Sequence, residues 1–106
     1  MAVAWDSING GLAGIDTSSR DLRTAWQLDV RPSMQPVVFP DSGELAINDY
    51  TAAGTDDIIV VDLATGDLLD RVDTGSRIGN GMFLTPDGHR GLFYCTTLTL
   101  AKITWA

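Results

Sequence analysis

The feature that most constrains the fold of this chain is an internal repeat with a spacing of 46 residues. Shifting the sequence against itself by that spacing gives a series of identities in one ungapped stretch. They are Asp16 with Asp62, Asp21 with Asp67, Leu22 with Leu68, Arg31 with Arg77, Pro40 with Pro86 and Asp41 with Asp87. Conservative matches lie between them, including Trp26 with Val72. A repeat of this length indicates that one supersecondary unit recurs and that neighbouring units stack to bury a shared core.

The complete repeat predicts four short strands separated by turns, over residues 35–39, 44–48, 57–62 and 68–72. In the second strand Leu45 and Ile47 alternate with more polar residues, so one face is apolar. The third strand contains residues 58–61, which are β-branched and apolar on both faces. Such a strand is expected to be central and covered on both sides.

Fragments of the same pattern flank the complete unit. Residues 11–16 and 22–28 match its last two strands, and residues 82–85, 91–96 and 102–105 match its first three, which gives nine strands at most. We therefore divide the single segment 1–106 into the end of one unit (10–29), a complete unit (34–73) and the start of another (81–106).

Four antiparallel strands in about 40 to 50 residues are typical of a β-propeller blade. The predicted fold class is all-β, an incomplete propeller of antiparallel four-stranded blades. A closed propeller needs about four to eight blades. The expected partners are therefore the remaining blades of a longer propeller or, alternatively, other copies of the chain that complete the ring and cover its open edges.

Several stretches resemble the blades of the quinoprotein-like (PQQ-type) and YVTN-type propeller superfamilies. Residues 10–16 through Trp26 resemble the PQQ-type blade motif, and residues 57–72 resemble both forms. Residues 40–43 and 86–88 are similar to the Pro-Asp-Gly turn between the two innermost strands, and the resemblance covers roughly residues 10 to 105. It implies an architecture rather than one activity, because propellers of this kind serve as enzymes, scaffolds and ligand binders.

Composition narrows the classes of partner. The formal net charge is −7 at pH 7, which would repel nucleic acid and anionic lipid, so neither nucleic acid nor a membrane is an expected partner. No apolar run reaches the roughly 20 residues that cross a bilayer, and no signal peptide is recognisable, so a cytoplasmic location is the default expectation. Cys95 is the sole cysteine and cannot form an intrachain disulfide.

Candidate ligand-binding residues cluster at one predicted rim, where propellers generally place ligands. They are Arg31, Arg77, Asn48, Asp49, Tyr50 and Asn80, with Asp56 as a weaker candidate. Two arginines one repeat apart would converge toward the axis and could hold the carboxylate or phosphate of a small anionic ligand. The structural alternative is a salt bridge from Arg31 or Arg77 to Asp49 that joins neighbouring units.

Other polar residues have simpler interpretations. Asp16 and Asp62 are expected to cap turns, Asp56 and Asp57 to lie in a solvated loop, and His89 to lie on the surface. Trp5, Trp26 and Trp105 are expected to pack between sheets, and Cys95 to be a small packed residue. We predict no metal site, cofactor or catalytic residue. The predicted function is a non-catalytic binding or scaffold segment; the alternative is a fragment of a propeller enzyme, a lactonase-like hydrolase or a quinoprotein-like oxidoreductase.

Overall fold

A computed structural model describes residues 1–78, 83–96 and 98–105, and within these ranges the chain contains strands and no helix. Accordingly, none of these described residues forms an apolar helix long enough to span a membrane. The strands are β1 (Ala2–Trp5), β2 (Leu12–Asp16), β3 (Arg23–Leu28), β4 (Val37–Phe39), β5 (Glu44–Tyr50), β6 (Asp56–Asp62), β7 (Leu68–Asp73), β8 (Phe83–Pro86), β9 (Gly91–Cys95) and β10 (Leu100–Thr104).

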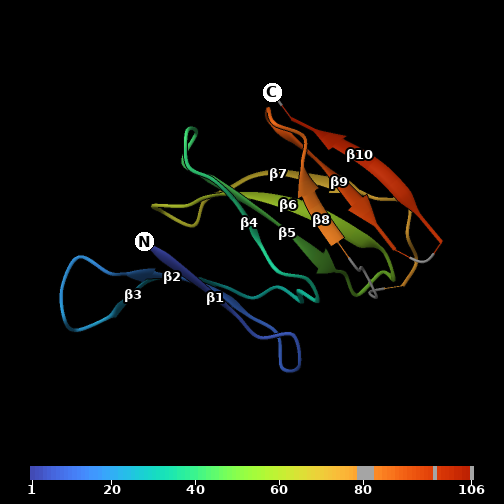
Figure 1. Cartoon of the computed structure of the whole chain (residues 1–106). Coiled ribbons are helices and arrows are strands. Elements are labelled where there is room, and N and C mark those ends of the chain that lie inside the picture. Colours follow the sequence, from blue (N-terminus) through green and yellow to red (C-terminus); the bar gives the residue numbers. More distant parts are fainter. Residues whose placement is uncertain (79–82, 97, 106) are drawn as a thin grey trace.

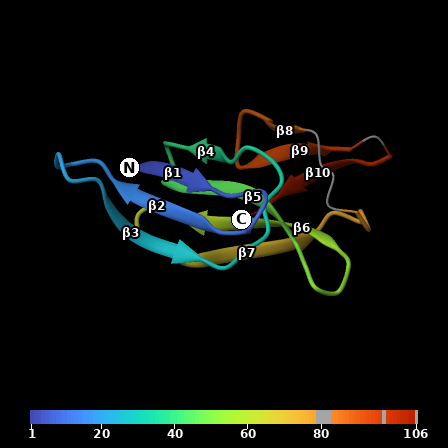
Figure 2. The same cartoon turned by 90° about the horizontal axis from the view of Figure 1, so that it is seen from below.

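The strands form three antiparallel sheets, each following the order of the chain without crossovers (Figure 1). We call them the N-terminal sheet (β1–β3), the central sheet (β4–β7) and the C-terminal sheet (β8–β10). Figure 2 shows β4 and β8 along one side of the molecule and β3 and β7 along the other. The strands β4 and β8 are in contact, so the central and C-terminal sheets also approach each other along these edges.

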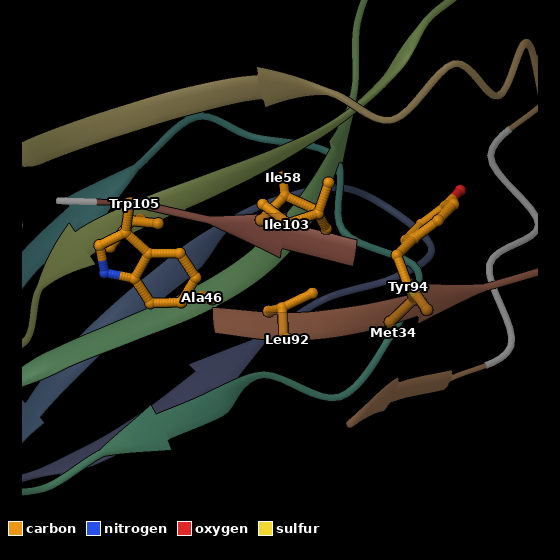
Figure 3. Packing of buried hydrophobic residues seen from close by; sticks show 8 residues of the cluster. Met34, Ala46, Ile58, Leu92, Tyr94, Ile103 and Trp105 are labelled. Atoms are coloured by element: carbon orange, nitrogen blue, oxygen red, sulfur yellow. The ribbon is translucent and has the colours of Figure 1, made fainter. Parts of the chain in front are cut away.

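The central sheet lies between the other two, because successive side chains of β5 and β6 point to opposite faces. Leu45, Ile47, Ile59 and Val61 face the N-terminal sheet, where they pack against residues that include Leu12. On the opposite face, the cluster with the C-terminal sheet consists of Met34, Ala46, Ile58, Val60, Leu92, Tyr94, Ile103 and Trp105. Figure 3 shows this cluster, with Trp105 at one end and Tyr94 beside Met34 at the other. Residues 58–61 are fully buried, which confirms the prediction of a strand covered on both sides.

Two tryptophans join the outer sheets to the central one, as predicted. The indole N–H of Trp26 donates to the Leu63 carbonyl at 2.9 Å, so the N-terminal sheet is tied to the turn after β6. Trp105 packs edge-on against Phe39 of β4, with ring centroids 5.2 Å apart. The third tryptophan, Trp5, was also predicted to pack between sheets, but this prediction was wrong because its side chain is 42% exposed.

A bidentate ion pair also links the central and C-terminal sheets. The Arg90 guanidinium donates to both carboxylate oxygens of Glu44, at 3.1 and 2.7 Å. Glu44 is buried, and its hydrogen bond with Arg90 is the main reason why the pKa of its carboxyl group is lowered.

All nine predicted strands are present, with ends that differ by a few residues, although Met82, at the start of one prediction, lies outside the described residues. The limit of nine strands was wrong, because β1 is a tenth strand and pairs with β2 from Ala2 to Trp5. The first predicted unit starts at residue 10, and no strand was predicted before it. The alternation of Val3 and Trp5 with small alanines was the available signal.

The repeat is preserved in space with two changes of register. The irregularity between Gly14 and Ile15 in β2 recurs between Val60 and Val61 in β6, one repeat later. In the adjacent strand, however, Gly14 pairs with Trp26 whereas Val60 pairs with Asp70. The counterpart of Trp26 is therefore Asp70, and the predicted match of Trp26 with Val72 was wrong by two residues, since the turn before β3 is longer.

The second change affects β9. Leu92 and Tyr94 face the sheet that precedes them in the chain, as Leu45 and Ile47 do in β5. The fixed spacing would instead have matched Leu92 with Ala46, which points to the other face. A shift by an odd number of residues exchanges the two faces of a strand, so the structural match of β9 with β5 is offset from the 46-residue spacing by an odd number of residues.

Candidate functional site

The predicted rim residues that the structure describes lie at one end of the central sheet, where β5 ends and the segment after β3 passes over it. A hollow of about 320 Å³ opens there, which we call the Arg31 hollow. Its lining residues are Ser7, Arg31, Pro32, Ser33, Tyr50 and Ile78. Arg31 and Tyr50, which sequence analysis had assigned to one site, therefore do lie together.

Backbone hydrogen bonds fix the position of Arg31 in this hollow. Its N–H donates to the Asp49 carboxylate at 2.8 Å, and its carbonyl accepts the N–H of Tyr50 at 3.0 Å. The side chain of Arg31 is exposed, and among the described residues no acidic side chain forms an ion pair with it. Its guanidinium donors therefore face the hollow and the solvent.

Asn48 positions Ser33, whose hydroxyl is a second hydrogen-bond donor of the Arg31 hollow. Its side-chain oxygen accepts the N–H groups of Ser33 and Met34, and its side-chain nitrogen donates to Ser33 Oγ at 2.9 Å. Because Ser33 Oγ is an acceptor in this bond, the Ser33 hydroxyl hydrogen is free to donate elsewhere. Asn48 itself is fully buried, so it supports the hollow from behind.

Tyr50 connects the hollow to the second predicted arginine. Its hydroxyl donates to the Arg77 carbonyl at 3.1 Å, which places the Arg77 backbone beside the hollow. The Arg77 side chain is exposed. Asn80, the remaining predicted site residue, lies outside the described residues.

An adjoining hollow of about 400 Å³ shares Arg31 and Tyr50 and contains a compact ionic cluster. Asp49 and Asp57 are direct cross-strand neighbours of β5 and β6, an arrangement in which like charges repel. Arg71 of β7 offsets this repulsion with two different guanidinium nitrogens. Its Nη2 lies 3.0 Å from the Asp49 carboxylate, and its Nη1 lies 3.0 Å from the Asp57 carboxylate.

This cluster corrects the predicted structural role of the arginines. Neither the Arg31 nor the Arg77 guanidinium bridges to Asp49 among the described residues; the ionic partner of Asp49 is Arg71. Arg71 is not among the predicted site residues, because it falls within the predicted strand 68–72 and not in a rim loop. The strand register was the signal available, since Arg71 pairs with Ile59 of β6, two residues from Asp57.

The prediction that Asp56 and Asp57 lie in a solvated loop was wrong. Asp56 is fully buried at the start of β6, and Asp57 is only 7% exposed. The Asp56 carboxylate accepts hydrogen bonds from the Asn48 amide at 3.0 Å and from the Tyr94 hydroxyl of the C-terminal sheet at 2.5 Å. Burial raises the pKa of Asp56 in spite of these bonds. Burial and the neighbouring Asp56 also raise the pKa of Tyr94 to about 12.

The remaining predicted residues lie apart from this end. Asp16 and Asp62 accept N–H bonds from the turns that follow them, which confirms their capping role. His89 is exposed, as predicted, and Cys95 is partly buried. No group of three or more acidic, histidine or cysteine side chains suited to a metal ion occurs in ranges 1–78, 83–96 and 98–105.

Comparison of the chain with family models, curated proteins and solved structures gives no match. What the site can bind must therefore be argued from its own geometry. The Arg31 hollow presents one exposed cation with a neighbouring serine hydroxyl, while Arg71 compensates part of the negative charge of Asp49 and Asp57 beside it. Such a set of donors suits a small anion.

Proposed function

We propose that this chain is a non-catalytic binding segment of a β-propeller and that the Arg31 hollow holds a small carboxylate or phosphate ligand. The propeller arrangement is supported by three meandering antiparallel sheets packed face to face. The contact between β4 and β8, the first strands of their sheets, supports a common inner side. The recurrence of the same irregularity in β2 and β6 supports a repeated unit.

The observation that carries the binding proposal is the environment of the Arg31 guanidinium. Two other arginines, Arg71 and Arg90, are held by carboxylates within 3.0 Å. Arg31 instead lines two adjoining hollows, where Ser33 offers a further hydrogen-bond donor. A guanidinium can form two parallel hydrogen bonds with a carboxylate or phosphate, and a hydroxyl donor beside it would fix the orientation of the anion.

Binding rather than catalysis is favoured by the state of the acidic groups at this end. Asp49 and Asp57 are engaged by Arg71, and Asp56 is fully buried and hydrogen-bonded. A general acid or base must be within hydrogen-bond reach of a substrate. These three carboxylates are committed to the protein itself.

The test is a titration of the ¹⁵N-labelled chain with succinate and, separately, with inorganic phosphate, followed by NMR. We expect concentration-dependent shifts at the amides of Arg31, Ser33 and Tyr50. Arg31→Gln should weaken binding of the effective anion about tenfold or more, since hydrogen bonds to charged groups contribute about 1.5–3 kcal/mol. Arg77→Gln should also lower the affinity for the anion if both guanidinium groups bind it.

Arg23→Gln is the matched control, because Arg23 is also exposed but lies in β3 away from the hollow. It removes the same charge and should leave the affinity unchanged within about twofold. Equal losses for Arg31→Gln and Arg23→Gln would mean that only net charge matters, and that result would overturn the site. Absence of any shift with both anions would do the same.

A further inference from the structure

Each contact between sheets in this chain joins two different kinds of face. We call the face turned to the next sheet along the chain the forward face, and the face turned to the previous sheet the backward face. The forward face of the N-terminal sheet, with Leu12, packs on the backward face of the central sheet, with Leu45. The forward face of the central sheet, with Ile58, packs on the backward face of the C-terminal sheet, with Leu92.

The two contacts are built from repeated positions. Leu12 and Ile58 are one repeat apart, and Leu92 of β9 faces the preceding sheet as Leu45 of β5 does. The same head-to-tail contact therefore occurs twice within one chain. It leaves one backward face, on the N-terminal sheet, and one forward face, on the C-terminal sheet, without a neighbouring sheet among the described residues.

The free forward face carries large apolar side chains. Strand alternation and register place Phe83, Phe93, Leu100 and Lys102 on it, together with Cys95. Phe83, Phe93 and Leu100 are 59, 40 and 75% exposed. The Lys102 ammonium lies 5.8 Å from the centroid of the Phe93 ring, so the face combines large apolar side chains with one positive charge and the hydroxyl groups of Thr85 and Thr104.

The free backward face has the opposite character. Ala4, Ala13 and Gln27 are cross-strand neighbours towards one end of it, and with other residues they line a hollow of about 590 Å³. Asp6 and Asp29 lie at the edge of the same hollow. Small side chains in a hollow with two carboxylates complement large side chains that carry a lysine, both in shape and in charge.

We infer that the free forward face of one copy of the chain packs on the free backward face of a second copy, and that two copies close a ring. The inference rests on the proposed propeller architecture but not on the ligand of the Arg31 hollow. Two copies supply twice the three sheets of one chain, which falls within the four to eight of known closed propellers, whereas three copies would exceed it. A head-to-tail contact that closes leaves no apolar face open.

The experiment measures the mass of the 106-residue chain in solution by sedimentation equilibrium at 0.15 M salt, over a range of protein concentrations. We expect a species of twice the chain mass of 11.4 kDa. Phe93→Asp places a charge in the centre of the forward face and should raise the dimer dissociation constant about thirtyfold or more, as expected for an interface anchor. Leu22→Asp is the control, because Leu22 is 69% exposed in the turn before β3 and should not affect association.

Ala13→Arg distinguishes a head-to-tail contact from a symmetric one. It alters only the backward face and should also produce monomers, although Phe93 is intact. If Ala13→Arg stays dimeric while Phe93→Asp is monomeric, the forward faces pair with each other and the inference is wrong. Circular dichroism confirms that each variant is folded; if Phe93→Asp is not, Lys102→Glu provides the same test with a milder change on the same face.

A wild-type chain that is monomeric at every concentration would also overturn the inference, and further repeats or another protein would then cover the faces. This result is distinguishable from failure of the ligand site. A monomer that binds succinate or phosphate through Arg31 retains the proposed function, whereas a dimer that binds neither retains only the contact between copies.

Discussion

Asp56 shows how a single buried carboxyl group makes the stability of this fold depend on pH. Its side chain is fully buried between the central and C-terminal sheets, and burial raises its pKa above the ordinary value. A raised pKa in the folded state means that the folded protein binds the proton more tightly than the unfolded chain. Asp56 therefore contributes most to stability below its unfolded pKa, and that contribution is lost as pH rises through the folded pKa.

We predict that Asp56→Asn becomes progressively more stable relative to the wild type as pH rises from about 3 to 7. Asparagine keeps an acceptor for the Asn48 amide but cannot ionise, so it avoids the cost of a buried charge. The measurement is chemical denaturation of both proteins across this range. The other acidic groups are common to both and largely cancel in the difference. A difference in unfolding free energy that is constant with pH would contradict the prediction.

The residues of the candidate site were predictable to different degrees. The repeat predicted Arg31 and Arg77 as site residues, and Tyr50 was predicted because it follows the second strand of the repeat. The structure places all three at one end of the central sheet. The ionic role of Arg71 and the burial of Asp56 were not predictable, because both depend on how far each strand extends and which residues pair across it.

At the level of elements, the packing of Trp26 against two glycines makes the N-terminal sheet sensitive to the turn after β6. A Cβ atom added at Gly66 would lie 2.7 Å from ring atoms of Trp26, and one at Gly14 would lie 2.3 Å from them. Gly66 also has a φ of +79°, which disfavours any other residue. The turn and the indole ring are therefore fitted to each other.

We predict that Gly66→Ala destabilises the protein more than Gly75→Ala. Gly75 has a similar φ of +84°, but a Cβ atom there would meet nothing within 4 Å. Both substitutions carry the cost of a left-handed residue, roughly 1–2 kcal/mol. Only Gly66→Ala must also displace Trp26, which adds about 1–3 kcal/mol. Urea denaturation of the two variants measures the difference, and equal losses would show that Trp26 moves aside without cost.

Most elements followed from the sequence because turns and apolar alternation are local signals. The turns after Asp16 and Asp62 and the doubly covered strand 58–61 were all predicted and are present. The exact alignment of the units was not, because turn length varies between copies and the register is decided by packing across sheets. The face that Leu92 presents is an example, since it follows from contact with the central sheet.

For the whole molecule, the arrangement of one doubly covered sheet between two singly covered sheets predicts an uneven stability. Residues in the middle of β5 and β6 are buried on both faces, and β6 pairs with β5 and β7 along this stretch, while β5 pairs with β6 throughout and with β4 from Glu44 to Ala46. Amides of β1 and β10 lie on edge strands of the outer sheets. Regions with few buried contacts open at a lower free-energy cost.

We therefore expect native-state hydrogen exchange to be slowest in residues 45–48 and 58–61 and faster in β1 and β10. At concentrations where copies associate, protection should rise most in the two outer sheets, because their free faces would then be covered. Equal protection of all three sheets in dilute protein would contradict the expected order and would indicate that they open as one unit.

Turn length differs between the units, and this affects how the repeat can be recognised in the sequence. Two extra residues before β3 leave every side chain on its original side, whereas in β9 an odd offset from the fixed spacing keeps Leu92 and Tyr94 turned towards the central sheet. Between these units the face on which the apolar residues lie is kept, whereas their distance along the sequence is not. Repeats of this kind are therefore better recognised by aligning the positions that face a neighbouring sheet than by a fixed spacing in the sequence.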